Sequence, residues 1–438
     1  MIRRFLSDHK RFKNISRFWR LALALHLLPL AALITITAPW TTGDSERYIG
    51  LSESLLRGGG FGLGDETSYE PEGWRLPGYP LFIAASRLII GHNNFGIVLI
   101  QTALFLASVW FVYKVAIRAF DELTGFVFLV FSAIYPFVAY SVGQLSPETP
   151  VVFLVSLAFF LLSDPTTPRV ALAALVIGLS AYVRPNLILL NIALAAALVL
   201  INRNNYRKAL LMVVIAITIA FPWALRNYRL FGIFTPTPAI KGSGNSLLLA
   251  TWQSRVSIPS LIEYGMNGNV TSEARSSGMA DQISGLNRQL GVPESALFVT
   301  PESYPGNRLK LKADALFAEA AFANIKNYPI EYLKSCFINT FRMWFSAYFP
   351  GSFPVAIRYG LLAEGILVLI IGLGGAFISM RGYDERQKTV LILFIMTFLY
   401  FALTLCWLHT EARYTIPARL PLLLFAARFV SHSQGRRA

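Results

Sequence analysis

The residues best suited to chemistry lie between Thr41 and Arg75, where acidic side chains gather in a chain that has few of them. The chain has 438 residues, of which 24 are Asp or Glu. Seven of these lie between Thr41 and Trp74: Asp44, Glu46, Glu53, Asp65, Glu66, Glu70 and Glu72. The segment closes on Arg75-Leu-Pro-Gly-Tyr-Pro80, a turn restrained by its prolines. A carboxylate base held near a phosphate-binding guanidinium is the chemistry that this pattern indicates.

Composition places this segment in a membrane protein. The chain is 55% hydrophobic and 14% charged, its mean hydropathy is +0.52, and its apolar runs approach the roughly 20 residues that cross a bilayer. The net charge of +15 does not indicate nucleic acid, because the basic residues lie at the ends of apolar runs rather than in one basic domain. Two cysteines give no disulfide framework and no metal spacing.

We predict an all-α, polytopic transmembrane helical bundle, because backbone polar groups in lipid must be satisfied within each segment. About ten spans fit the apolar runs. These are residues 18–40, 95–117, 123–142, 149–163, 169–183, 187–202, 208–225, 356–379, 389–408 and 415–430. They form one domain over residues 1–430, followed by a short tail at 431–438.

The distribution of basic residues predicts the topology. Seven lysines and arginines lie within the first 20 residues, around the start of the first span, which puts the N-terminus in the cytoplasm, and the alternation of spans puts the C-terminal tail there too. The first loop, residues 41–75, and a large loop, residues 228–330, then face outward. The large loop is rich in Ser, Gly and Asn up to Pro305 and has a helical pattern from Leu309 to Lys326.

Several motifs resemble integral-membrane glycosyltransferases of the GT-C type, and in particular bacterial relatives of the dolichyl-phosphate-mannose protein mannosyltransferases and of the lipid A aminoarabinose transferase. The motifs are Asp44-Ser-Glu-Arg-Tyr48, Arg75-Leu-Pro-Gly-Tyr-Pro80, Ser180-Ala-Tyr-Val-Arg184-Pro185, Phe221-Pro-Trp-Ala-Leu-Arg226-Asn227 and Glu411-Ala-Arg413-Tyr414. They follow the order of that family and extend from about residue 40 to 430. One departure is that Ser45 separates Asp44 from Glu46, where the protein mannosyltransferases carry an adjacent Asp-Glu pair.

The resemblance implies roles for the two best-placed carboxylates. Asp44 is the candidate general base, although an aspartate at this position also suits a helix N-cap. Glu148 is the second candidate, and Ser146-Pro-Glu148 is equally typical of an ordinary helix start. Glu46 is a candidate substrate-binding residue.

Four arginines are candidates for a lipid phosphate: Arg75, Arg184, Arg226 and Arg413. A guanidinium matches phosphate geometry bidentately. The alternative is that each arginine extends its side chain to the lipid head groups at the end of its span. Tyr79 is a candidate for sugar stacking, although aromatic residues at the water boundary are common in any membrane protein. His409 beside Glu411 is a possible metal pair without a recognisable third ligand, so no metal and no cofactor are predicted.

Together the resemblance implies an inverting glycosyltransferase of the bacterial cytoplasmic membrane. It is expected to take a sugar from an undecaprenyl-type phosphate donor and to transfer it, on the outer face, to a protein, lipid or envelope glycan. Two other classes fit the hydropathy: a secondary transporter, and a non-catalytic flipping or assembly partner for envelope polysaccharide. The charges favour the enzyme, because most lie at span ends rather than at mid-membrane, where transporters place theirs.

Overall fold

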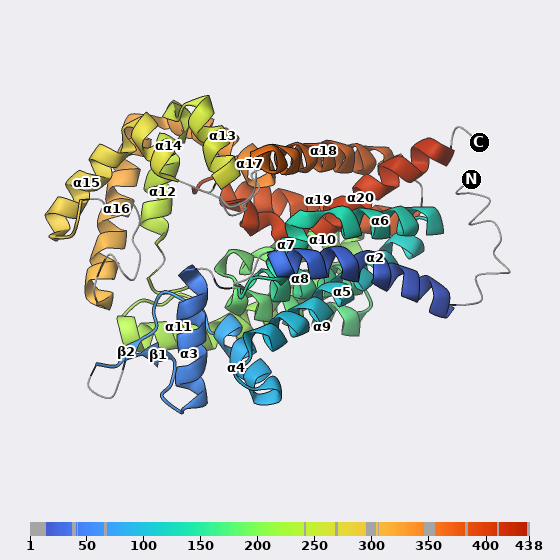
Figure 1. Ribbon diagram of the computed structural model, residues 1–438, viewed down its shortest axis with the longest axis horizontal. Coiled ribbons are helices and arrows are strands. Elements are labelled where there is room, and N and C mark those ends of the chain that lie inside the picture. Colours follow the sequence, from blue (N-terminus) through green and yellow to red (C-terminus); the bar gives the residue numbers. More distant parts are fainter. Residues whose placement is uncertain are drawn as a thin grey trace.

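The computed structural model describes residues 15–36, 41, 43–64, 68–240, 242–267, 270–294, 304, 306–345, 355–381, 384–409 and 411–435. Helices make up nearly all of the regular structure in these ranges, beside one two-stranded sheet. Figure 1 shows a bundle of long, roughly aligned helices with a group of shorter helices at one end. Helix α2 begins and α20 ends at the other end of the bundle. The prediction of an all-α, polytopic bundle is confirmed.

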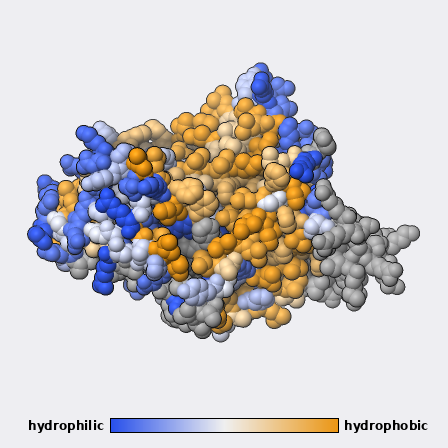
Figure 2. All heavy atoms as spheres, turned by 90° about the horizontal axis from the view of Figure 1, so that it is seen from above, coloured by the Kyte–Doolittle hydropathy of each residue, from blue (hydrophilic) through white to orange (hydrophobic). Residues whose placement is uncertain are grey.

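The bundle is built from apolar helices. They are α2 (Ile15–Ile36), α5 (Asn94–Ala119), α6 (Glu122–Ile134), α7 (Pro136–Val142), α8 (Glu148–Leu162), α9 (Thr167–Val183), α10 (Leu190–Ile201), α11 (Tyr206–Phe231), α18 (Val355–Ser379), α19 (Glu385–Leu405) and α20 (Ile416–Gly435). Short 3₁₀ turns join some of them: η1 (Pro185–Leu187), η2 (Arg203–Asn205) and η4 (Ala412–Thr415). Figure 2 shows the apolar surface that covers the bundle, with hydrophilic surface at its ends.

The described helices support several of the predicted spans. Four are long and apolar enough to cross a membrane: Asn94–Ala119, Arg203–Phe231, Ile357–Ser379 and Glu385–Leu405. Five shorter apolar helices are Ala24–Ile36, Gly78–Ile90, Glu148–Leu162, Thr167–Val183 and Pro185–Ile201. The predicted span 415–430 corresponds to α20, which belongs neither to the four long apolar helices nor to the five shorter ones. The number of spans therefore stays a prediction.

The predicted continuous span at residues 123–142 is wrong in one respect. Helices α6 and α7 meet at Tyr135 with a bend of 59°. Pro136 has no N–H to donate, and its ring disfavours the α conformation of the residue before it; Tyr135 is accordingly extended, with φ −85° and ψ 99°. The bend sends α7 toward the segment that precedes Glu148.

The large loop, residues 228–330, is more regular than its composition predicted. It contains α12 (Ser243–Trp252), η3 (Gln253–Arg255), α13 (Ile258–Asn267), α14 (Val270–Ser277), α15 (Met279–Leu290) and α16 (Asn307–Asn327), and α17 (Pro329–Phe345) follows. Of the helices inside the loop, only α16 was predicted. The shorter helices are stabilised by a second apolar core, in which Leu248, Ile283 and Phe317 are buried. Such long-range packing overrides the weak helix propensity of Ser, Gly and Asn.

The first loop, with the helix that follows it, forms a small unit of its own. It contains α3 (Gly43–Leu56), a hairpin of β1 (Gly62–Leu63) and β2 (Glu70–Pro71), and α4 (Gly78–Ile90). The strands pair antiparallel, with Gly62 opposite Pro71 and Leu63 opposite Glu70. The hairpin returns the chain toward α3, so Arg75, which follows the hairpin, comes close to Asp44 at the start of α3.

Candidate active site

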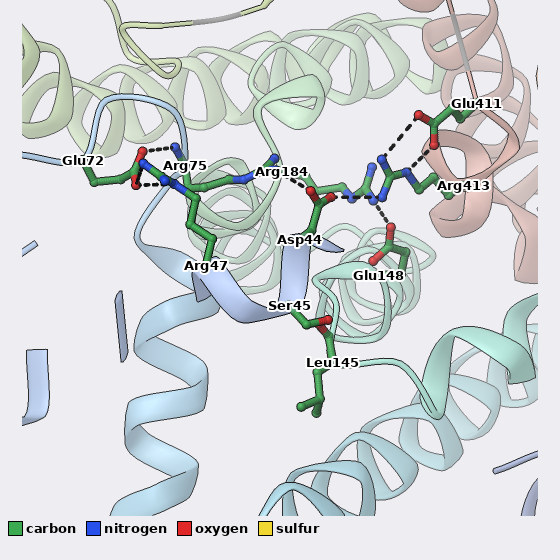
Figure 3. A network of polar contacts seen from close by, with 10 residues as sticks. All are labelled: Asp44, Ser45, Arg47, Glu72, Arg75, Leu145, Glu148, Arg184, Glu411 and Arg413. Atoms are coloured by element: carbon green, nitrogen blue, oxygen red, sulfur yellow. Dashed lines mark hydrogen bonds and ion pairs between the residues drawn. The ribbon is translucent and has the colours of Figure 1, made fainter. Parts of the chain in front are cut away.

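Asp44 lies at the centre of a charged cluster whose residues come from segments far apart in the sequence (Figure 3). Its side chain stands in the first turn of α3, with Oδ1 2.5 Å from Nη2 of Arg75 and Oδ2 3.3 Å from Nη1 of Arg413. The three side chains are partly open, with exposed fractions of 30% for Asp44, 22% for Arg75 and 27% for Arg413. A small ligand therefore has access to the charges.

The cluster keeps Asp44 ionised. Burial alone would raise the pKa of its carboxyl group, but the positive charges of Arg75 and Arg413 outweigh burial and lower the pKa below its usual value. In the absence of a ligand Asp44 is therefore a carboxylate whose oxygens are engaged by two guanidinium groups. An anion that binds these arginines in place of Asp44 would raise the pKa of the Asp44 carboxyl group.

Arg75 is positioned by a buried acid three residues before it. The carboxylate of Glu72 accepts hydrogen bonds from the backbone N–H groups of Trp74, at 2.5 Å, and of Arg75, at 2.9 Å. Its other oxygen lies 2.8 Å from Nε of Arg47. The Arg75 guanidinium also lies over the ring of Tyr48, 5.4 Å from its centroid. These contacts fix both the backbone and the head group of Arg75.

Glycine at position 78 brings two motifs into contact. A Cβ atom on Gly78 would lie 2.7 Å from the carbonyl carbon of Tyr182, closer than real Cβ contacts. Only glycine allows the turn after Arg75 to pack directly on the backbone that carries Arg184. Spacing along the sequence gave no sign of this contact.

Arg184 and Glu148 form a buried ion pair beside Asp44. Glu148 is in the first turn of α8, and Arg184 follows the last residue of α9. The Arg184 guanidinium lies over the ring of Tyr414, 5.3 Å from its centroid, next to Arg413. Arg413 itself pairs with Glu411, Nε to Oε2 at 2.5 Å.

The segment before Glu148 is anchored to α3 and α5. The Ser45 hydroxyl donates a hydrogen bond to the carbonyl of Leu145, at 2.8 Å. The side-chain amide of Gln101 donates to the carbonyls of Val142 and Gln144, both at 2.8 Å. Ser45, which interrupts the Asp-Glu pair of the resembling family, thus has a buried positioning contact here.

Three predicted residues do not join the cluster. Arg226 donates to the backbone carbonyl of Glu72, at 2.9 Å, and lies over the ring of Trp223, at 4.4 Å, so it supports the hairpin instead of facing Asp44. Tyr79 is fully buried, and its hydroxyl donates to Gln101 at 3.0 Å, which does not support sugar stacking. Glu46 is exposed and has no ion pair among the described residues.

His409 belongs to a second, buried cluster instead of pairing with Glu411. Its Nε2 lies 3.0 Å from Oε2 of Glu273, and Nη1 of Arg342 lies 3.1 Å from the other oxygen of that carboxylate. The cluster ties α14 and α17 to the segment that carries Arg413. Within the part of the chain that the structure describes, no three His, Cys, Asp or Glu side chains are arranged to hold a metal ion.

Sequence reasoning missed the importance of Glu72, Glu273 and Arg342. Glu72 was visible as one of seven loop acids, and its position three residues before Arg75 was the available signal. Glu273 and Arg342 had none, because their partners lie far away along the chain.

Comparisons with known proteins match part of the chain in sequence and nearly all of it in fold. A family model described as dolichyl-phosphate-mannose-protein mannosyltransferase matches residues 71–225, which include the turn after Arg75, Glu148 and Arg184. No curated protein matches the chain in sequence.

Among solved structures, the chain resembles the oligosaccharyltransferase AglB of Archaeoglobus fulgidus. The complex with an inhibitory peptide and a dolichol-phosphate matches with a TM-score of 0.52 and 12% identity over 97% of this chain, and the apo form with 0.51 and 13% over the same share. The chain spans about half the length of that protein, 51% in both cases. ArnT of Cupriavidus metallidurans bound to undecaprenyl phosphate matches with a TM-score of 0.40 and 13% identity, over 96% of this chain and 79% of ArnT. The family match and the fold shared with AglB confirm the resemblance found in the sequence: this membrane protein has the GT-C fold of integral-membrane glycosyltransferases.

Proposed function

We propose that this protein is a glycosyltransferase that moves a sugar from a polyprenyl-phosphate donor to an acceptor hydroxyl or amide at the outer face of a bacterial cytoplasmic membrane. The observation that carries the proposal is the partly open carboxylate of Asp44 between the guanidinium groups of Arg75 and Arg413. A carboxylate and two phosphate-binding cations within one cluster are what the reaction requires.

The donor phosphate would replace Asp44 as the partner of these arginines. A phosphate offers more oxygens and more charge than one carboxylate, and each guanidinium matches it bidentately. Arg184, which stacks on Tyr414 beside Arg413, extends the positive surface. When the arginines bind the phosphate, Asp44 loses their positive charges, which lower its pKa. Donor binding would therefore itself activate the base.

Transfer then follows in a single displacement. The acceptor oxygen or nitrogen forms a bond to the anomeric carbon, its proton passes to Asp44, and the bond from that carbon to the phosphate oxygen breaks. The arginines stabilise the charge that develops on the departing polyprenyl phosphate. Base and leaving group act on opposite sides of the sugar, so the product has the inverted anomeric configuration.

We assign Glu148 a positioning role in this scheme. Its carboxylate is buried against Arg184, which favours orientation of that guanidinium over direct proton transfer. Tyr48 and Glu72 position Arg75 in the same way.

A lipid-borne donor suits the location. Nucleotide sugars are made in the cytoplasm, so an enzyme acting on the outer face must use a donor carried in the bilayer. AglB, whose fold this chain shares, has been solved with a dolichol-phosphate bound, and an undecaprenyl-type phosphate is the bacterial counterpart that we propose here. The acceptor is a protein, a lipid or an envelope glycan.

The test is sugar transfer in vesicles that contain the purified protein and a panel of radiolabelled undecaprenyl-phosphate sugars. Appearance of the radiolabelled sugar in a product other than the donor distinguishes an enzyme from a transporter or a flipping partner. Asp44→Asn keeps the size of the side chain and removes the basic oxygen, so we expect a rate loss of at least about 10²-fold.

Asp121→Asn is the matched control. Asp121 caps α6 by accepting from the N–H of Thr124, and it pairs with Arg428 at 3.2 Å; like Asp44, it therefore lies at the start of a helix and pairs with an arginine. Near-normal turnover is expected per folded protein. Equal effects of the two substitutions, or near-normal turnover in Asp44→Asn, would reduce Asp44 to a structural residue.

A further inference from the structure

A cavity of about 220 Å³ lies at the ends of α5, α8, α9 and α19. Three arginines line it, Arg118, Arg169 and Arg386, together with one acid, Asp164. Its apolar wall includes Val115 and Val390.

The cavity and the candidate active site lie at opposite ends of the same helices. Helix α8 begins at Glu148 in the cluster around Asp44 and ends at Leu162, next to the cavity. Helix α9 begins at Thr167 beside the cavity and returns to Arg184. The 15 residues of α8 separate the two places by about 22 Å. If the active site faces outward, the cavity opens at the cytoplasmic end.

The charges around the cavity are not balanced. Arg169 pairs with Asp164, which is the one acid of the lining. Arg118 lies over the ring of Phe160, 5.0 Å from its centroid, and neither it nor Arg386 has an ion pair with a carboxylate in the described part of the chain. Three guanidinium groups that face one small space repel each other, and a bound anion relieves that repulsion.

We propose that this cavity binds the phosphate of an anionic phospholipid head group from the cytoplasmic leaflet. Guanidinium forks match phosphate oxygens, and basic pockets between the cytoplasmic ends of membrane helices suit anionic lipids.

Such a lipid would hold together helix ends that come from distant parts of the chain, namely those of α5, α9 and α19. The binding site does not depend on the proposed transferase activity, because it shares no residue with the cluster around Asp44. Lipid binding is therefore measurable whatever reaction the protein catalyses.

The experiment uses the purified full-length protein in neutral detergent. Phosphatidylglycerol, phosphatidylcholine or inorganic phosphate is added, and thermal unfolding and bound lipid, by native mass spectrometry, are measured. We expect phosphatidylglycerol to bind and to raise the unfolding temperature. Phosphatidylcholine has the same phosphodiester with a compensating cation, and it should have little effect.

The decisive variants are two double substitutions with the same change of charge. Arg118→Gln with Arg386→Gln should raise the apparent dissociation constant of phosphatidylglycerol by at least roughly tenfold. Arg203→Gln with Arg207→Gln alters basic residues of the same end that do not line the cavity, and it should leave the dissociation constant unchanged.

Three outcomes would overturn the proposal. Equal weakening by both double variants would mean unspecific attraction of anionic lipid. Stabilisation by inorganic phosphate equal to that by phosphatidylglycerol would identify the ligand as a free anion. If the glutamine pair yields no folded protein, Arg118→Lys with Arg386→Lys replaces it, and an unchanged affinity for phosphatidylglycerol in that pair would also refute the site.

Discussion

Glu72→Gln is the substitution that best tests how the site is held in place. Glu72 is fully buried, and its carboxylate contacts Arg47 and the N–H groups of Trp74 and Arg75. Glutamine keeps the size, and its one carbonyl oxygen can still accept from the backbone. Its NH₂ group would then face the guanidinium of Arg47, so the variant loses one charged contact and gains an unfavourable one.

The magnitude follows from these contacts. A hydrogen bond to a charged group contributes about 1.5–3 kcal/mol, and the partial exposure of Arg47 to water places the loss near the lower end. Because the same carboxylate fixes the backbone of Arg75, part of this loss should appear in donor binding. A shift of about 1.4 kcal/mol corresponds to a tenfold higher donor KM. We expect an increase of roughly three- to tenfold with a smaller change in kcat.

The assay is donor KM and kcat in vesicles, normalised to folded protein. Glu53→Gln is the control, because it breaks an ion pair of the same kind, Glu53 to Arg87 at 2.9 Å, between α3 and α4. That variant should lower stability without changing donor KM. The reasoning fails if both variants change KM equally, or if Glu72→Gln lowers only the yield of folded protein.

Further predictions concern the turn, the phosphate contact and the second cluster. Arg75→Lys should weaken donor binding by roughly 1–2 kcal/mol and Arg75→Ala by more, because lysine keeps the charge but loses the fork; an unchanged donor KM in Arg75→Ala would remove this residue from the site. Gly78→Ala should lower both thermal stability and turnover, since its Cβ would collide with the backbone of Tyr182; normal unfolding and turnover would show that the contact relaxes freely. Burial and the charge of Arg342 lower the pKa of His409 from 6.5, so the unfolded state binds the proton more tightly than the folded state. The contribution of His409 to the free energy of unfolding is therefore fully present above pH 6.5, and it is lost as the pH falls below that value. Unfolding temperatures measured from pH 7.5 to 5 should fall less in His409→Gln than in the parent, and equal slopes would contradict the assignment.

Much of the architecture follows from the sequence alone, because membrane insertion depends on local properties. An apolar run must satisfy its own backbone, so hydropathy alone predicts helices such as α5 and α19. The break before Pro136 is also a local effect, and the sequence contained it although the prediction of a continuous span overlooked it. Candidate site residues such as Asp44 and Arg75 were recognisable from their motifs.

The assembly of the site depends on tertiary structure. Asp44 and Arg413 are 369 positions apart, and only the packing of α3 against the segment after α19 brings them within 3.3 Å. The same packing turns Arg226 to the hairpin, although its motif looked equivalent to that of Arg184. Motifs specify residue types, whereas the direction of a side chain depends on which helices pack around it.

Burial decides the remaining roles. Glu72 and Glu273 are as polar in sequence as the exposed Glu46, yet the fold removes both from water and pairs each with an arginine. A carboxylate is tolerated in such a place only with charged and hydrogen-bonding partners, which here come from distant segments. Sequence therefore determined which groups are available for chemistry, and the three-dimensional packing decided which of them meet in the cluster around Asp44 and which hold the others in position.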